Sequence, residues 1–279
     1  MASSMILYWG SGSPPCWRVM IALEEKNLQG YQQKLLSFEK NEHKSEPVMA
    51  INPRGQVRAS FHTESVVSNR QRLAYFDAVK LLSHQRRSVK EASSGDTVVV
   101  YLRRDFGLNE HWSYTVLLLS LLDRSLRVVT QNQFKSQGTQ LIPDSSAEQA
   151  LVYQRMFETL TLQQKMADVI YYTWRVPEDE RHDSAVKRNK EALSAELQLW
   201  EGYFQKMDAG SYAAGRNFTM ADVMVFPQIA YAFRFGLSPE KFIKLGEYHN
   251  LVKKRPSVEA SWPPHWKENP QGMDILKDF

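Results

Sequence analysis

Several hydroxyl side chains and the chain's single cysteine gather around one turn near the start of the sequence. Tyr8, Ser11, Ser13 and Cys16 lie close together there. Ser13 and Cys16 have the spacing of a redox Cys-x-x-Cys motif, but the serine makes a dithiol cycle impossible, so we expect Cys16 to be a small packed side chain. A hydroxyl at the start of a helix can donate to an anion, and the helix dipole adds its positive end. The residue types predict anion stabilisation, with Ser13 as the first candidate, Tyr8 as its rival and Ser11 as the third.

These side chains need a strand, a turn and a helix to hold them. The apolar run Met5–Trp9 predicts a buried strand, and the glycines, serines and prolines after it predict a turn. Cys16–Lys26 has a helical pattern that stops before Gly30. Gln33–Phe38 predicts a second strand, and Glu46–Ile51 predicts a helical turn. The order strand, helix, strand predicts a parallel βαβ unit.

The second half of the chain has a helical pattern throughout. Ala147–Trp174 and Ser184–Met207 predict two long helices, each with an apolar stripe. Thr219 and Asp222 have the spacing of a capping box, with aspartate in the place of glutamate. The almost wholly apolar Val223–Phe235 then predicts a helix buried in a bundle. Shorter helices are predicted near Pro239–Leu245 and Tyr248–Lys254.

Length and composition bound the class of protein. The chain has 279 residues, 43% hydrophobic and 24% charged, which is a globular profile with room for two domains. A single cysteine permits no intrachain disulfide. We see no signal peptide, and the most apolar run, Val116–Leu122, is far shorter than the roughly 20 residues of a membrane span. These observations predict a cytoplasmic protein that binds no membrane.

One internal segment differs from the rest of the chain. From Arg58 to Thr130 there are eleven basic and seven acidic residues, so this stretch carries the whole net charge of +4. Its apolar residues show no sustained period, and its short apolar runs lack the cap and turn signals found elsewhere. Basic residues confined to an aperiodic stretch, rather than spread over one face, argue against nucleic-acid binding.

Three stretches form a pattern through their order and spacing. The first, Leu7–Val19, contains the strand, the turn and the helix start. The second combines His43-Lys44-Ser45 with Asn52-Pro53-Arg54-Gly55-Gln56-Val57, and the third is the capping box from Thr219 to Asp222. In this order they resemble the cytosolic glutathione transferases. The chain is most similar to the rho class, which is related to the theta and zeta classes. The further stretches that point to this class are Leu151–Glu158 and Ser257–Trp266.

The resemblance implies the glutathione transferase architecture. An α/β thioredoxin-like domain, residues 1–140, would bind glutathione, and an all-α helical bundle, residues 145–279, would follow it. Residues 58–131 would interrupt the first domain as an anomalous insertion, because the family pattern is intact on both sides. We hypothesise that retained intron sequence or a faulty gene model produced most of this segment.

The resemblance also implies a reaction and a site. Glutathione would be the co-substrate, no metal would be needed, and hydrophobic electrophiles would be conjugated by a detoxifying homodimer. Ser13 would stabilise the glutathione thiolate, with Tyr8 as the alternative. The residues that would bind glutathione are Ser11, His43, Gln56 and Val57. The electrophile would lie between the domains, against Tyr153, Phe157 or Trp174.

The sequence departs from the family at the edge of the anomalous segment. The family has a cis-proline after the Gln-Val pair, whereas Val57 is followed here by Arg58. The Glu-Ser or Gln-Ser pair that would bind the γ-glutamyl end is also missing from its expected context. An impaired binding or scaffold protein therefore stands as the alternative to an active transferase, and a nucleic-acid-associated module, resting only on the basic segment, is a third hypothesis.

Overall fold

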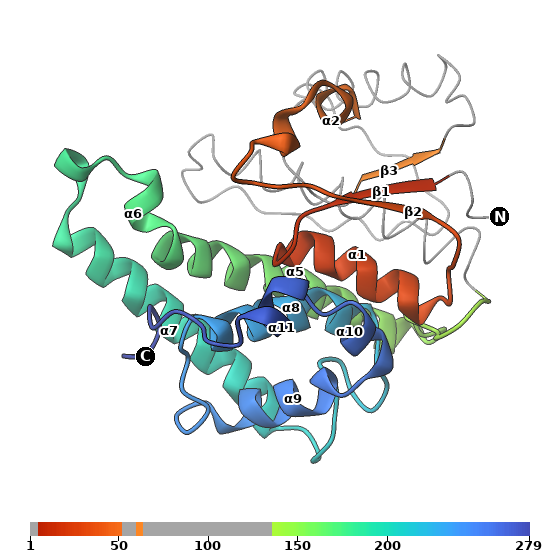
Figure 1. The fold of residues 1–279 in the computed structure, drawn as a ribbon. Helices are drawn as coiled ribbons and strands as arrows, with labels where there is room; N and C mark the ends of the chain where they lie inside the picture. The colour runs from red at the N-terminus through yellow and green to blue at the C-terminus, as the bar shows by residue number, and fades with distance from the viewer. Residues whose placement is uncertain (1–4, 52–59, 64–135) are drawn as a thin grey trace, which may run out of the picture.

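The computed structural model describes residues 5–51, 60–63 and 136–279. A small sheet lies on one side of the first helix and a group of helices lies on the other (Figure 1). In the described part of the chain, no helix is both long and apolar enough to cross a membrane.

The sheet has three described strands in the order β2-β1-β3. The central β1 (Met5–Trp9) pairs in parallel with β2 (Gln32–Leu35) and antiparallel with β3 (Ser60–Thr63). Successive side chains of a strand point to opposite faces, so Leu7 and Trp9 join the hydrophobic core while Tyr8 faces the other way. The strand β3 lies within the segment for which the sequence predicted no element, and it is held by pairing with β1.

Helix α1 (Pro14–Glu25) connects the sheet to the helical part of the molecule. It begins two residues before the predicted start, because Pro14 and Pro15 occupy the first helical positions, where a missing N–H costs nothing. Trp17 of this helix is buried edge-on against Phe226, with 5.4 Å between the ring centroids. Its indole also contacts two tryptophans of the C-terminal region, so α1 is anchored at its first turn.

The C-terminal part is a bundle in which α5 (Ser146–Ile170) packs between α7 (Asp183–Gln205) and α8 (Met220–Arg234). The long helix predicted to end at Trp174 instead breaks at Tyr171. Both short helices predicted after residue 238 correspond to one helix, α9. The remaining helical elements of the described residues are α2 (Glu46–Ile51), α6 (Tyr172–Arg175), α9 (Ile243–Lys253), α10 (Pro256–Ala260), α11 (Pro264–Glu268) and the 3-10 turns η1 (Glu42–Lys44) and η3 (Glu178–Glu180).

The predicted capping box at the start of α8 is confirmed. The Thr219 side chain accepts from the backbone N–H of Ala221, and the Asp222 carboxylate accepts from the Thr219 N–H at 2.8 Å. The same carboxylate accepts from the Tyr248 hydroxyl and from the Ala213 N–H, so it ties α8 to α9 and to the preceding loop. Complete burial raises the pKa of Asp222 to about 6, and these hydrogen bonds limit the rise.

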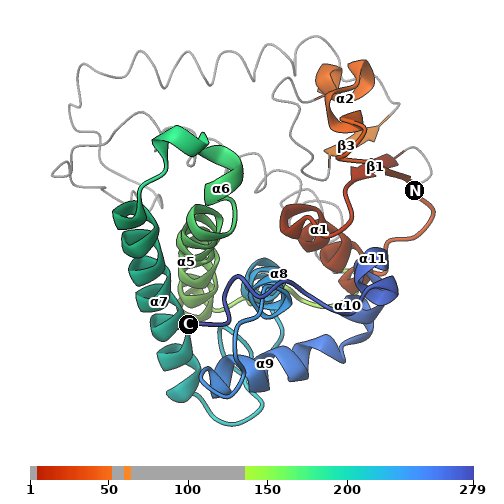
Figure 2. The ribbon, with the colours of Figure 1, turned by 60° about the vertical axis from the view of Figure 1, so that its left-hand side comes forward.

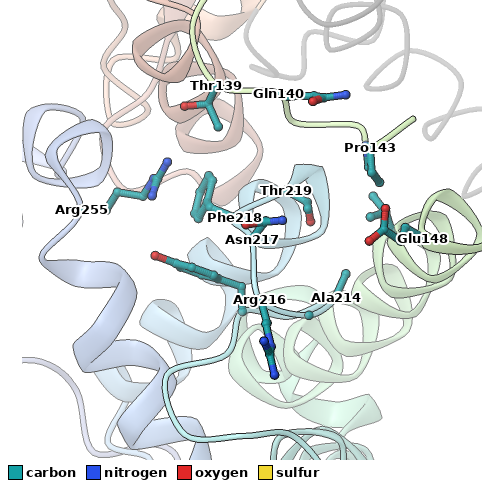
Figure 3. Close-up of a pocket in the computed structure, with 13 residues that line it drawn as sticks. Thr139, Gln140, Pro143, Glu148, Ala214, Arg216, Asn217, Phe218, Thr219 and Arg255 are labelled. Carbon is teal, nitrogen blue, oxygen red and sulfur yellow. The ribbon is translucent and has the colours of Figure 1, made fainter. Parts of the chain in front are cut away.

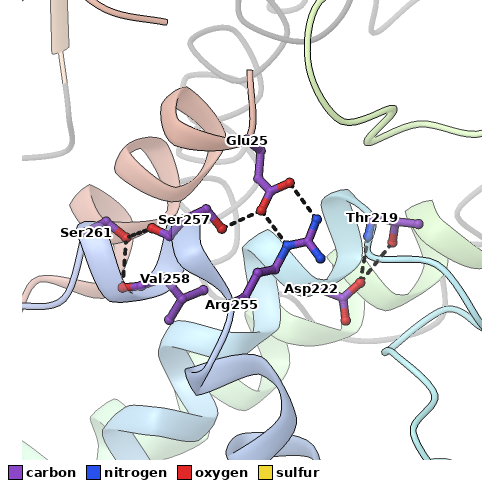
Figure 4. A network of polar contacts seen from close by, with 7 residues as sticks. All are labelled: Glu25, Thr219, Asp222, Arg255, Ser257, Val258 and Ser261. Atoms are coloured by element: carbon purple, nitrogen blue, oxygen red, sulfur yellow. Dashed lines mark hydrogen bonds and ion pairs between the residues drawn. The ribbon is translucent and has the colours of Figure 1, made fainter. Parts of the chain in front are cut away.

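A buried ion pair joins the end of α1 to the start of α10 (Figure 4). Arg255 donates from Nη2 to Oε2 of Glu25 at 2.8 Å and from Nε to Oε1 at 2.5 Å, and the Ser257 hydroxyl donates to the same carboxylate. Burial disfavours the charged carboxylate, but hydrogen bonds from Arg255 and Ser257 outweigh it and hold the pKa of Glu25 below its usual value. This pair connects residues at opposite ends of the chain.

Replacing Glu25 with glutamine should lower the free energy of unfolding at neutral pH by about 2 kcal/mol, because Arg255 then lacks a charged partner. The carboxylate has a depressed pKa in the folded state. Its contribution is therefore present above the unfolded-state pKa of about 4.3 and is lost as the pH falls through the folded-state value. Urea titrations at neutral and acid pH should show the difference shrinking in acid. Glu191→Gln, at an exposed position on α7, should change stability by less than about 0.5 kcal/mol. An equal loss for Glu25→Gln at every pH would contradict this account.

Candidate active site

A cleft of about 690 Å³ opens at the N-terminus of α1. Its walls come from the turn before α1, from α5 and α6, from the end of α8 and from the C-terminal tail. Of the predicted site residues, Ser11 and Ser13 line this cleft. The cleft therefore combines the turn that carries the hydroxyl groups with side chains from the helical bundle.

Ser13 is the N-cap residue of α1, with extended backbone, and its hydroxyl makes no capping hydrogen bond. An N-cap side chain usually accepts from the second or third helical residue, but here the second is Pro15, which has no N–H. The Ser13 carbonyl accepts from the Trp17 N–H at 3.0 Å, which fixes the residue at the helix start. The hydroxyl thus lies at the positive end of a helix and is not used by that helix.

Ser11 is in contact with the C-terminal region. Its hydroxyl lies 2.6 Å from Nδ1 of His265, a residue of α11. Gly12 between the two serines has a φ of +73°, and a Cβ there would lie 2.5 Å from the His265 ring. Burial lowers the pKa of His265 and the positive charge of Arg234 lowers it further, while Glu268 acts in the opposite sense. The lowered pKa favours the neutral imidazole, which offers one donor and one acceptor.

Tyr8 and His43 lie away from the cleft lining. Tyr8 is 8% exposed within β1, and the Lys34 ammonium lies 5.4 Å from its ring centroid. His43, in η1, lies with its ring 5.4 Å from that of Phe38, which does line the cleft. The structure thus brings Ser11 and Ser13 together in the cleft lining, and places the His43 ring against that of Phe38. Gln56 and Val57 are outside the described residues.

Four aromatic side chains line the cleft together with Ser13, and we define them as the aromatic wall: Tyr171, Trp174, Tyr231 and Trp266. The two tyrosine hydroxyls lie 2.5 Å apart, and the Tyr231 ring stacks on Trp266 with 6.0 Å between centroids. Burial raises the pKa of Tyr231, so its phenol stays protonated at neutral pH. Trp174, one of three aromatic residues that the family resemblance offered for the electrophile pocket, lines the cleft, whereas Tyr153 and Phe157 are not among the lining residues.

Similarity to known proteins fits this arrangement. The chain is 53% identical to glutathione S-transferase A of Pleuronectes platessa, over the full length of both chains. It belongs to the glutathione S-transferase family. The family model for the glutathione S-transferase C-terminal domain matches residues 162–261. A more distant relative, glutathione S-transferase TCHQD of Arabidopsis thaliana, is 21% identical over 91% of this chain and 88% of its own length.

Solved structures of glutathione S-transferases share the fold. The enzyme of the Antarctic clam Laternula elliptica is 29% identical, with 99% of each chain covered and a TM-score of 0.68. A glutathione transferase homologue from Sulfitobacter, solved with bound glutathione, has a TM-score of 0.60 at 18% identity, covering 92% of this chain and 96% of its own. The predicted fold class, a thioredoxin-like N-terminal part followed by a helical bundle, is confirmed.

A second cleft, of about 710 Å³, lies away from Ser13 (Figure 3). It is enclosed by the linker at Thr139 and Gln140, the start of α5, the loop from Tyr212 to Thr219, and Arg255. It contains none of the predicted site residues that the structure describes. Over the described ranges there is also no cluster of three or more His, Cys, Asp or Glu residues that could hold a metal ion.

No local pattern in the sequence indicates the three basic residues of this transferase's cleft. Arg175 ends α6, Arg234 ends α8 and His265 lies in α11, and each reaches the cleft only through the packing of the helices and the tail. The stretch Ser257–Trp266 contains prolines and tryptophans, but nothing in its pattern indicates contact with the turn at Ser11. Figure 2 shows α11 lying beside α1.

Replacing Gly12 with alanine should separate His265 from Ser11. Left-handed backbone costs a residue with a Cβ about 1–2 kcal/mol, and the added methyl group would also collide with the imidazole. Gly30→Ala is the matched control, because Gly30 has a φ of +83° but nothing within 4 Å of the added Cβ. Thermal denaturation should show comparable losses of stability. Only Gly12→Ala should lower kcat/KM for conjugation, by about tenfold. Equal activities in the two variants would contradict a role for the Ser11–His265 contact.

Proposed function

We propose that this chain conjugates glutathione to electrophilic small molecules, with Ser13 donating a hydrogen bond to the glutathione thiolate. The observation that carries the proposal is the hydroxyl of Ser13, which lines the cleft at the start of α1 and is not used as a helix cap. The family relationship and the aromatic wall of the same cleft support the same function.

The chemistry follows from the acidity of the thiol. A free thiol titrates near about 8.5, so most of it is protonated and a poor nucleophile at neutral pH. Hydrogen bonding from Ser13 and the positive end of α1 favour the thiolate. The sulfur then attacks an electrophilic carbon held against the aromatic wall, forming a C–S bond while the leaving group takes the electron pair. Ser11 and His43 are proposed to contact glutathione, together with Gln56 and Val57.

Several finer features belong to the same proposal. The motifs are most similar to the rho class, and we propose a cytoplasmic homodimer with a glutathione-binding domain at 1–140 and a helical domain at 145–279. We also propose that 58–131 interrupts the family pattern as an insertion. Two features support this: the segment carries the whole net charge of +4, and its sequence is aperiodic. Strand β3 lies inside the segment and pairs with β1 of the sheet.

Mass spectrometry of the native protein tests the origin of that segment. If retained intron sequence or a faulty gene model produced it, tryptic peptides should cover residues on both sides of 58–131 but none from inside it. Peptides within the segment that match the printed sequence would contradict this origin. The segment contains many trypsin cleavage sites, because it is rich in arginine and lysine.

Ser13→Ala should lower kcat/KM for glutathione with 1-chloro-2,4-dinitrobenzene by about 100-fold, the usual effect of removing one donor to a reacting anion. The pKa of bound glutathione, read from the ultraviolet absorbance of the thiolate, should rise towards the free value. Steady-state kinetics and this titration together distinguish loss of thiol activation from loss of binding.

Tyr8→Phe is the matched control, since it also removes one hydroxyl. We expect it to change kcat/KM by less than about threefold, because Tyr8 does not line the cleft. A larger loss in Tyr8→Phe than in Ser13→Ala would transfer the role to the tyrosine. No conjugation by the wild-type chain, with glutathione still bound, would favour the binding or scaffold protein instead.

A further inference from the structure

The described lining of the cleft carries an excess of positive charge. Arg175 and Arg234 line it together with His265, and no aspartate or glutamate is among the described lining residues, while Glu268 acts on His265 from outside that lining. Within the described residues neither arginine forms an ion pair. Two guanidinium groups facing a cleft without a carboxylate create a potential that attracts an anion.

Both arginines lie over aromatic rings of the cleft wall. The guanidinium carbon of Arg234 lies 5.6 Å from the ring centroid of Trp266, and that of Arg175 lies 5.2 Å from that of Tyr171. Stacking uses the flat face of a guanidinium and leaves its N–H edge available for hydrogen bonds in the plane. The planar fork of such an edge matches the two oxygens of a carboxylate.

Arg234 is the better placed of the two. It is the last residue of α8, it is half-buried, and its carbonyl accepts from the Met273 N–H at 3.0 Å. Its backbone is therefore held on both sides, by the helix and by the tail. Arg175 is exposed at the end of the short α6 and lies at the mouth of the cleft.

The tyrosine pair lies between the two arginines on the same wall. One hydroxyl of Tyr171 and Tyr231 donates to the other, so the pair has one O–H left to donate. The wall thus offers apolar ring faces for a flat body, one neutral donor, and a cationic group at each end.

We propose that the cleft selects electrophiles that carry a carboxylate on a flat aromatic or conjugated body, with Arg234 as the principal contact and Arg175 as a second contact at the mouth. The inference rests on the proposed function and names the substrate class of that same cleft. The body of the electrophile lies against the aromatic wall, and its reactive carbon faces Ser13 and the thiolate.

A matched pair of electrophiles tests this selectivity. 4-Chloro-3,5-dinitrobenzoate and 4-chloro-3,5-dinitrobenzamide share the ring and the leaving group and differ in charge. In both, the thiolate sulfur forms a bond to the ring carbon, the C–Cl bond breaks, chloride leaves with the electron pair, and the thiol proton goes to solvent. Each kcat/KM is divided by the uncatalysed rate with glutathione, because the two rings differ in intrinsic reactivity.

The wild-type enzyme should prefer the benzoate over the benzamide by about tenfold on this scale, the size expected for one charge-assisted hydrogen bond. Arg234→Gln should bring the ratio close to 1, and Arg175→Gln should reduce it about threefold. Arg234→Lys should retain part of the preference, since it keeps the charge but loses the fork. Lys187→Gln, which removes the same charge from an exposed position on α7, should leave the ratio unchanged.

A binding experiment separates this inference from the proposed function. Unreactive 3,5-dinitrobenzoate and 3,5-dinitrobenzamide are titrated against the fluorescence of the cleft tryptophans, and the ratio of their Kd values should follow the same order in all variants. The preference should weaken with added salt. A wild-type chain that conjugates neither electrophile but binds the benzoate preferentially would remove the proposed function and keep the anion site.

Two results would overturn the anion site. One is a wild-type ratio near 1 in both experiments. The other is an Arg234→Gln variant that raises the KM for glutathione equally with both electrophiles and leaves their ratio intact, because the guanidinium would then bind a carboxylate of glutathione.

Discussion

The burial of the Trp17 indole is the interaction on which the rest of the site depends. Its ring packs among Phe226, Trp262 and Trp266, and its Nε1 donates to the Ser261 hydroxyl at 3.1 Å. The helix begins one turn before Trp17, and the Trp17 N–H donates to the Ser13 carbonyl at this start. Packing of this kind is close to that of a crystal, so a shift of the indole would move the turn at Ser11–Ser13 with it.

The cleft lies between the start of α1, the helical bundle and the C-terminal tail, so no single element forms it. A rigid helix N-terminus supplies the anion-stabilising end, and the bundle supplies aromatic surface and positive charge. Glu25 and Arg255 hold the far end of α1, so the helix is fixed at both ends relative to the bundle. Two remote contacts thus position the helix, and the Ser13 hydroxyl is not used as a helix cap, whereas the Ser11 hydroxyl contacts His265.

Local sequence signals predicted those elements that are stabilised by interactions between residues close in sequence. The apolar run of β1 and the Thr219–Asp222 box each act within a few residues, whereas Pro14 and Pro15 were assigned to the turn although they begin α1. Strand β3 escaped prediction because its four residues have no amphipathic pattern and owe their conformation to pairing with β1. His265 and Arg234 escaped for a similar reason, since only the packed tail brings them to the cleft.

The contact between Ser11 and His265 spans 254 positions of the sequence. A ribosome releases the chain from the N-terminus at about 5–20 residues per second, so the turn at Ser11 emerges well before its partner. During that interval the residues that pack on Trp17 have not yet been synthesised, so the apolar face of α1 is uncovered. The contact between Ser11 and His265 therefore forms only after the helical bundle has been synthesised, and until then the nascent first half carries exposed apolar surface.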